Sequence, residues 1–470
     1  MKSEPVSLPA QSHNGKKFGK AIVMGASIAG LWTARALIDH FDEVWVLERD
    51  HLPEGAEFRS GAPQVRQYHT LLESGLRQMK EWFPGLDEEL ISAGAVPYDV
   101  TGDIHLRASN FWYPRFLSGS VLLSCSRLLL EASLRRRLRQ NPCIRFAEGV
   151  EVIGLHTDEE KRRVTGVRIR NRRGGSAGQE ADPVYEAELV VDALGRRSRT
   201  PEWLVEMGYS APKESEVDSF LGYVTRKYKR KPNTPMILIL ATPPNDPYGG
   251  LVFPEENDTM VAFIAGCNKH YPPTDPEEFD AFFHVLGPEF EEALRGAEPI
   301  SQPSGYRGTS SHWHHYEGLQ RWPERFVVLG DAFCGFNPIY GQGMSVAAMS
   351  AVALADRLQH CHGNLDGVAK PTLRKIGKIT EGVWLLATSA DLQWPGTQGG
   401  TVGHNPIDRF GRWYVGKMLE ATLFDKQVRL EFLAVNQLVK PATALFAPGV
   451  FIRVMKHMLL KKRRRVENSF

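Results

Sequence analysis

The sequence AIVMGASIAG, residues 21–30, decides the fold class of this 470-residue chain. An apolar run ends at Gly25 and Gly30 follows it, which is the spacing of a dinucleotide-binding turn between a strand and a helix. The first glycine of such a turn permits a tight bend, and the third lets helix and strand pack closely. The middle position, where glycine is usual, is Ser27. Serine is small and can place its hydroxyl or N–H near a phosphate, so it is compatible with this interpretation while making the match less specific.

The residues after this turn complete a strand–helix–strand unit. Apolar side chains recur at helical spacing in LWTARALIDHF (residues 31–41), and VWVL (residues 44–47) predicts a second strand that ends at Glu48. A pyrophosphate would sit at the helix N-terminus, where free N–H groups favour an anion. Glu48 lies about 20 residues after the first glycine, where an acid accepts a hydrogen bond from a ribose 2′-hydroxyl. An acid there argues against an adenosine 2′-phosphate at this position.

A second stretch, VVDALGRRSRTPEWL at residues 190–204, combines a strand with a turn. The buried strand ends at Asp192, Gly195 permits a sharp bend, and the arginines that follow can contact anions. This pattern is common in sheet proteins, so by itself it is weak evidence for a cofactor site.

A third stretch, VVLGDAFCGFNPIYGQGMSVA at residues 327–347, predicts a strand, a loop and a helix. Asp331 ends the strand, where its carboxylate can accept from polyol hydroxyls, and Pro338 stiffens the loop. Gly341 and Gly343 leave room for a flat ring against the backbone, and the helix that follows aims its N-terminus at that ring. Close packing alone would explain the glycines but not the aspartate and the proline.

The composition is that of an ordinary soluble globular protein, with 42% hydrophobic and 24% charged residues. Lys and Arg number 57 against 55 Asp and Glu, and the net charge of +2 gives no basic footprint for nucleic acid. The five cysteines are scattered without a C-x-x-C pair, which favours a reducing, cytoplasmic location over a disulfide framework or a zinc site. The stretch HWHH at residues 312–315 has no cysteine partner beside it, and a polar edge strand is expected there, with no metal site.

No apolar window has the length that a signal peptide or a membrane span requires. The stretch FIRVMKHMLLKKRRR, residues 451–465, places apolar residues near one helical face ahead of five basic residues. We expect a terminal helix packed on the body of the protein, with weak contact to a membrane surface as the alternative.

The three stretches, in this order and at this separation, resemble the FAD-dependent monooxygenases of the p-hydroxybenzoate hydroxylase type, the group A flavin monooxygenases. The resemblance covers roughly residues 19–360 and is strongest to a bacterial branch with polyether epoxidases and squalene-epoxidase-like enzymes. Residues 61–86 and 315–332 strengthen the assignment to that branch. The resemblance implies an α/β fold, in which a Rossmann-like FAD-binding domain carries an inserted antiparallel β-sheet substrate domain and a C-terminal helical region.

That fold implies a division of the chain. A polar tail would occupy residues 1–18, the FAD-binding domain residues 19–212 and 301–362, the substrate-binding sheet residues 213–300, and the helical region residues 363–470.

Carried over residue by residue, the family motifs imply a set of FAD-binding positions. The set is Gly25, Ser27, Ile28, Ala29, Gly30, Glu48, Arg49, Arg59, Arg127, Asp192, Gly195, Asp331, Pro338, Gly341, Gln342, Gly343 and Met344. Arg59 and Arg127 would reach the cofactor from a loop and a helix. Asp331 would bond the ribityl hydroxyls, and residues 341–344 would face the pyrimidine side of the flavin. No catalytic residue is assigned.

The resemblance implies a monooxygenase of secondary metabolism, in which reduced flavin and dioxygen form a hydroperoxide that delivers one oxygen atom. Epoxidation of a lipophilic polyene, polyketide or terpenoid is expected, because an alkene attacks the peroxide directly and no protein base is evident. NADPH or NADH would supply the electrons, by direct docking or through a partner flavin reductase. The alternatives are an aromatic hydroxylase, a prenyl-type flavin reductase of the same fold, and a flavoprotein or lipid carrier without turnover.

The pocket for such a substrate is expected between the central strands, residues 217–265, and the C-terminal helices. Trp384, Trp394 and Trp413 are candidates to line it, although aromatic residues at such spacing more often belong to a core.

Overall fold

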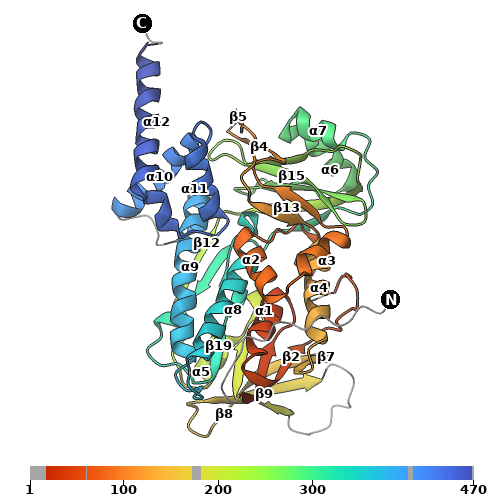
Figure 1. Ribbon diagram of the computed structural model, residues 1–470, viewed down its shortest axis with the longest axis vertical. Coiled ribbons are helices and arrows are strands. Elements are labelled where there is room, and N and C mark those ends of the chain that lie inside the picture. Colours follow the sequence, from red (N-terminus) through yellow and green to blue (C-terminus); the bar gives the residue numbers. More distant parts are fainter. Residues whose placement is uncertain (1–16, 60, 110, 172–181, 401–405, 468–470) are drawn as a thin grey trace.

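A computed structural model describes residues 17–467, except residues 60, 110, 172–181 and 401–405. Residues 1–16 of the expected polar tail lie outside the described residues. Figure 1 shows a parallel sheet with its helices at one end of the molecule and an antiparallel sheet at the other. Helices α10 (Pro406–Thr422) and α11 (Lys426–Asn436) lie beside the antiparallel sheet (Figure 1).

The parallel sheet grows from the apolar run before Gly25. Its five strands have the order β19-β11-β1-β2-β7. They are β1 (Phe18–Met24), β2 (Phe41–Glu48), β7 (Ile144–Glu148), β11 (Leu189–Asp192) and β19 (Phe326–Val328). The apolar runs of β1, β11 and β19 are fully buried, as is typical of parallel strands covered on both faces.

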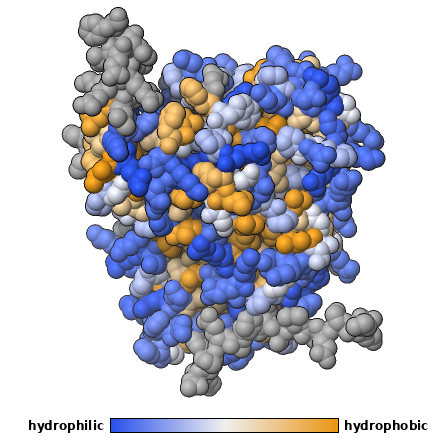
Figure 2. Space-filling model, turned by 45° about the horizontal axis from the view of Figure 1, so that its top comes forward, coloured by the Kyte–Doolittle hydropathy of each residue, from blue (hydrophilic) through white to orange (hydrophobic). Residues whose placement is uncertain are grey.

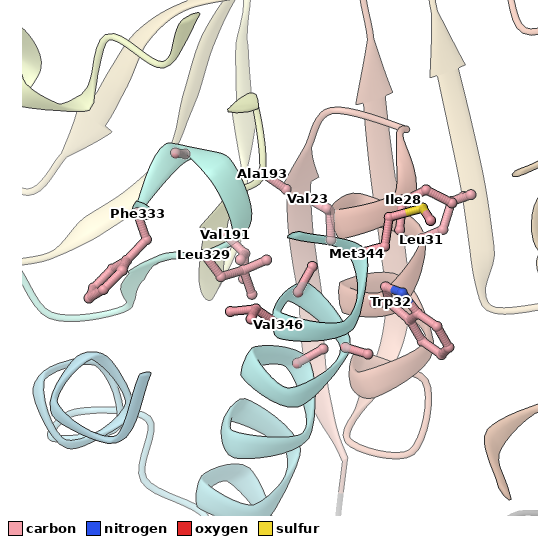
Figure 3. Close-up of a cluster of buried hydrophobic side chains, with 14 of the residues drawn as sticks. Val23, Ile28, Leu31, Trp32, Val191, Ala193, Leu329, Phe333, Met344 and Val346 are labelled. Atoms are coloured by element: carbon pink, nitrogen blue, oxygen red, sulfur yellow. The ribbon is translucent and has the colours of Figure 1, made fainter. Parts of the chain in front are cut away.

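Helices α1 (Ile28–Leu37) and α8 (Gly343–Gln359) pack on this sheet and on each other. Figure 3 shows Trp32 of α1 and Val346 of α8 in one buried cluster with Val23 of β1. The two expected cofactor helices therefore begin at the same edge of the sheet.

A second sheet has seven strands in the order β17-β13-β16-β15-β14-β4-β5. They are β17 (Ser304–Tyr306), β13 (Gly222–Lys229), β16 (Thr259–Gly266), β15 (Tyr248–Glu255), β14 (Met236–Ile239), β4 (Ile104–Ala108) and β5 (Phe111–Trp112). Neighbouring pairs are antiparallel except that β4 runs parallel to β14. The sheet thus extends beyond residues 213–300 and takes β4, β5 and β17 from the flanking segments.

Three smaller sheets complete the strands. The two-stranded sheet is β3 (Val96–Asp99) with β6 (Val121–Ser124), and the three-stranded sheet is β8 (Val150–Thr157), β9 (Val164–Asn171) and β10 (Val184–Glu186). The four-stranded sheet is β12 (Glu214–Asp218), β18 (Ser311–His314), β20 (Cys334–Gly335) and β21 (Gln398–Gly399).

The remaining helices cover the sheets or form the C-terminal region. They are α2 (Glu73–Trp82), α3 (Leu86–Ser92), α4 (Arg127–Arg139), α5 (Thr200–Glu206), α6 (Pro276–Ala281), α7 (Pro288–Leu294), α9 (Ala369–Asp391), α10 (Pro406–Thr422), α11 (Lys426–Asn436) and α12 (Pro448–Glu467). This arrangement confirms the expected α/β fold class with a Rossmann-like sheet, an antiparallel sheet and C-terminal helices.

The first half of α12 packs on the body of the protein. Val450 and Val454 are buried in a cluster with Tyr414 of α10, while Ile452 and Leu459 are exposed. Figure 1 shows the rest of the helix projecting away. Within the described part of the chain, none of the helices has the length and apolarity to cross a membrane. Contact of α12 with a membrane surface stays a prediction.

Candidate functional site

A single cavity of about 1270 Å³ connects the three stretches singled out in the sequence. Its polar half lies against the first turn and the loop before α8, and its apolar half lies between the seven-stranded sheet and helices α9 to α11. The volume exceeds the range of about 300–1,000 Å³ that is typical for one drug-sized ligand. The cavity therefore has room for a large ligand and a second molecule beside it.

The turn between β1 and α1 has the backbone that its glycines predict. Gly25 has a φ of 102°, and a Cβ there would lie 2.7 Å from the carbonyl oxygen of Ala193. A Cβ on Gly30 would overlap the carbonyl oxygen of Gly25. Gly30 therefore serves close packing and does not line the cavity. No side chain caps α1, so its first N–H groups are available to an anion.

Ser27 connects this turn to helix α4. Its hydroxyl accepts a hydrogen bond from Arg127 at 2.8 Å and donates one to Glu131 Oε2 at 3.1 Å. A glycine at this position would make neither bond. The serine thus holds a cationic side chain at the cavity wall next to the helix N-terminus.

Arg59 is buried among three carboxylates. Its guanidinium lies 3.0 Å from both Glu48 Oε2 and Glu131 Oε1, and 3.6 Å from Asp50 Oδ2. Burial lowers the pKa of Arg59, but Glu131 and Glu48 outweigh that effect and raise it. Glu48 also accepts the backbone N–H of Ala26 at 3.1 Å. Glu48, which is expected to bind a ribose, therefore also holds the turn and Arg59 in place. It lines the cavity as well.

Two more side chains complete the polar half. Arg49 lines the cavity and has no hydrogen-bond or ion-pair partner among the residues that the structure describes. His69, which sequence reasoning missed, has its Nε2 3.3 Å from Arg127 and its Nδ1 2.9 Å from the carbonyl oxygen of Gln67. Burial and the charge of Arg127 lower the pKa of His69 to about 3, so it is neutral and can accept from the arginine.

The structure corrects the expectation for Asp192. Its carboxylate is fully buried and does not line the cavity. It accepts hydrogen bonds from the hydroxyls of Ser198 and Thr200 and from the N–H of Leu194. Burial raises its pKa. Asp192 therefore shapes the turn, and Gly195, with a φ of 75°, brings the backbone of that turn to the cavity.

The loop before α8 presents both polar groups and bare backbone. The Asp331 carboxylate is 45% exposed at the cavity and lies 3.7 Å from Arg196 Nε. Gly341 has a φ of 65°, and a Cβ there would lie 2.8 Å from the Thr70 methyl. The Oε1 atom of Gln342 is buried without a partner among the described residues. Such an acceptor fits a ligand that brings an N–H or O–H group to the start of α8.

Of the expected cofactor positions, all except Gly30 and Asp192 line this cavity. The structure brings them together from the turn after β1, helix α1, the end of β2 with the segment that follows it, helix α4, and the two loops at the carboxyl ends of β11 and β19. Ligands of open α/β sheets bind at this edge.

The apolar half has the walls expected from the central strands and the C-terminal helices. Leu251 and Phe263 come from the sheet, and Trp394 and Phe432 come from the helical region. Trp384 instead belongs to the core, and Trp413 is exposed on α10. Figure 2 shows apolar side chains gathered across the middle of one face, with hydrophilic side chains around them.

Asp391, at the end of α9, is a second residue without a sequence signal. Its Oδ1 atom accepts from Asn337 and Tyr340 at 2.9 Å each and from Ser219 at 3.0 Å. Burial raises its pKa to about 6. The residue fixes the loop before α8 from behind the cavity wall.

No family model matches the chain. It is 32% identical over 386 residues to Protein Rv3254 of Mycobacterium tuberculosis, covering 80% of each chain.

Solved structures of flavoproteins share the fold at low sequence identity. A flavoprotein/dehydrogenase from Cytophaga hutchinsonii superposes with a TM-score of 0.67 at 15% identity, covering 96% of this chain and 100% of that one. The flavin-dependent brominase Bmp2 gives 0.63 at 15% identity, covering 94% and 99%. PqsL, a probable FAD-dependent monooxygenase from Pseudomonas aeruginosa, gives 0.57 at 16% identity, covering 80% and 97%. The chain therefore belongs to the family of Protein Rv3254 and has the fold of FAD-dependent monooxygenases and flavin-dependent halogenases.

Proposed function

We propose that this protein is a FAD-dependent monooxygenase that epoxidises an alkene of a lipophilic substrate. The observation that carries the proposal is the continuity of the cavity, whose polar half fits a dinucleotide and whose apolar half begins at the same loop. A cofactor and its substrate would meet where residues 341–344 separate the two halves.

The polar half has the groups that FAD needs. The uncapped N-terminus of α1, with Arg49 and Arg127 beside it, would bind the diphosphate. Asp331 would accept from the ribityl hydroxyls, and the unpartnered Gln342 Oε1 together with the N-terminus of α8 would face the polar edge of the flavin. When bound, FAD would supply two-electron redox chemistry and the activation of dioxygen.

The apolar half favours oxygen transfer to an alkene over chemistry that needs a base. Its described lining residues include leucines, phenylalanines and tyrosines but no carboxylate and no histidine. Removal of a proton from a phenol would call for such a group. The chain's own part would be to hold the alkene in place and to exclude water.

Two measurements test this proposal. Visible absorption of the purified protein, before and after excess FAD is added and removed, should show about one flavin per chain. With flavin bound, NADPH or NADH should reduce it, directly or through a flavin reductase, and labelled dioxygen should place one labelled atom in the product. A protein that retains no FAD would refute the cofactor, and saturation of the alkene without label would favour the reductase alternative.

A further inference from the structure

The apolar half of the cavity contains a buried cation. Arg429 of α11 is 5% exposed and lines the cavity among Leu419, Phe432 and Leu433. Within the described part of the chain, no carboxylate lies within ion-pair distance of it. Two other buried arginines are paired, because Arg35 lies 3.0 Å from Asp39, and Arg59 faces three carboxylates. Arg135 is also buried without a carboxylate at ion-pair distance among the described residues, but it donates to the carbonyl oxygens of Pro53 and Gly55 and does not line the cavity.

The described contacts of Arg429 leave most of its donors unused. One terminal nitrogen donates to the carbonyl oxygen of Pro114 at 2.5 Å. The guanidinium carbon lies 4.8 Å from the ring centroid of Tyr113 and 5.3 Å from that of Phe116. A guanidinium has five N–H donors and stays charged in proteins. One carbonyl and two aromatic faces compensate only part of its lost hydration.

The aromatic ring nearest to this cation carries a hydroxyl that is paired with a second one. The phenol of Tyr113 and the hydroxyl of Thr422 lie 3.3 Å apart, and both residues line the cavity. The Thr422 hydroxyl donates to the carbonyl oxygen of Leu419 at 2.6 Å, so the ligand contacts must come from the guanidinium itself. A guanidinium with unused donors is suited to a carboxylate or a phosphate, which accept two parallel N–H bonds. The side chains around them are suited to a hydrocarbon chain.

We propose that Arg429 binds the anionic head group of the substrate, which is therefore an amphiphilic acid, a carboxylate or phosphate ester with a long apolar chain. This inference rests on the proposed function for the role of the ligand as substrate. The head group lies at α11 and the chain runs through the apolar half toward the loop of residues 331–344. The buried cation selects acids over neutral lipids of equal length.

The test compares three probes of one chain length: laurate, dodecyl phosphate and dodecanol, each below its aggregation concentration. Calorimetry with the purified protein, after FAD has been added, should show that one or both anions bind about 30-fold or more tightly than dodecanol, because an unpaired buried charge costs at least that much. The anion that binds more tightly identifies the head group as a carboxylate or a phosphate. Equal binding of all three probes overturns the proposal.

Two substitutions locate the effect. R429Q should abolish the preference for anions and leave dodecanol binding unchanged, while R429K should keep part of it because the charge remains without the planar fork. K426Q is the matched control, since Lys426 is an exposed cation on the same helix that does not line the cavity. Loss of anion and dodecanol binding together in a folded R429Q protein would mean that the arginine only supports the wall, and would overturn the proposal.

The test of the head-group site can be distinguished from the test of FAD binding. Flavin absorbance should show the same FAD content in R429Q and wild type. If no FAD binds to either protein but the anion preference persists and depends on Arg429, the proposed function fails and the head-group site stands. If R429Q does not fold, as judged by circular dichroism, the comparison of probes on wild type and R429K decides.

Discussion

The phenolic hydroxyl of Tyr340 donates a hydrogen bond to Asp391 Oδ1 across 2.9 Å, which joins the end of α9 to the loop before α8. The same oxygen accepts a hydrogen bond from the side-chain amide of Asn337. The side-chain oxygen of Asn337 accepts from the N–H of Ile339, and these bonds fix the turn at the cavity. The second carboxylate oxygen is buried without a partner among the described residues. A buried, half-satisfied carboxylate is therefore part of what shapes the expected flavin site.

The stability of the protein should respond to the titration of Asp391. Burial raises its pKa to about 6, whereas an aspartate in an unfolded chain has about 3.9. The folded state binds the proton more tightly, so the ionised carboxyl opposes folding above about pH 6, and this opposition is relieved as the pH falls. Denaturant unfolding of wild type and D391N at pH 5 and pH 7.5 measures this effect. Relative to D391N, wild type should have a free energy of unfolding that is about 1–2 kcal/mol higher at pH 5 than at pH 7.5. A difference that does not change with pH would contradict this assignment.

Gly30 should not tolerate a methyl group. A Cβ there would overlap the carbonyl oxygen of Gly25, and both glycines are buried. We expect G30A to lower the free energy of unfolding by about 1–3 kcal/mol, the usual cost of overpacking. G411A is the matched control, because Gly411 is helical in α10 and has open space around it. The control should be neutral or stabilised by about 0.5–1 kcal/mol, and equal losses in both variants would argue against the close approach.

The hydroxyl of Ser27 should contribute to stability through its two charged partners. S27A removes the part-buried bonds to Arg127 and Glu131, and hydrogen bonds to charged groups are worth about 1.5–3 kcal/mol. We expect a loss of that order in the free energy of unfolding. S92A should change little, since Ser92 is exposed and bonds one backbone carbonyl. No loss in S27A would mean that the hydroxyl is dispensable and that only small size matters there.

Asp331 should govern FAD affinity without governing the fold. Its carboxylate is half exposed at the cavity, so D331N should leave thermal unfolding nearly unchanged. Loss of charge-assisted bonds to the ribityl hydroxyls should weaken FAD by about tenfold to a hundredfold, measured by titration of flavin fluorescence. D356N, at an exposed position of α8 outside the cavity, should bind FAD as wild type does. Unchanged FAD affinity in D331N would remove Asp331 from the cofactor site.

Local sequence was sufficient for the core of the fold. The glycines and the apolar runs specify a strand, a tight turn and a helix by local sterics, and Glu48 ends the second strand, so this unit was predictable. The parallel pairing of β4 with β14 was not, because the partners are far apart in sequence and Ile104–Ala108 carries no sign of which strand it joins. Pairing of this kind depends on tertiary packing.

The candidate site divides in the same way. Most positions within the motifs line the cavity, as the sequence predicts. A strand-end aspartate such as Asp192 can face either the ligand or its own turn, and the positions of Ser198 and Thr200 decide between the two. His69, Asp391 and Arg429 are single polar residues in ordinary segments. Their significance comes from neighbours that the chain brings in from elsewhere.

The seven-stranded sheet bears on how this protein can be recombined with its relatives. Because β4, β5 and β17 belong to it, a chimera that exchanges residues 213–300 would receive a sheet without three of its strands. Strands β4 and β5 lie in the first quarter of the chain, between the glycine turn of residues 25–30 and α4. A transplant of substrate preference would therefore have to extend the exchanged segment to residue 306, which includes β17, and to carry residues 96–124 as well. The unit of exchange is then two segments that are separated in the sequence.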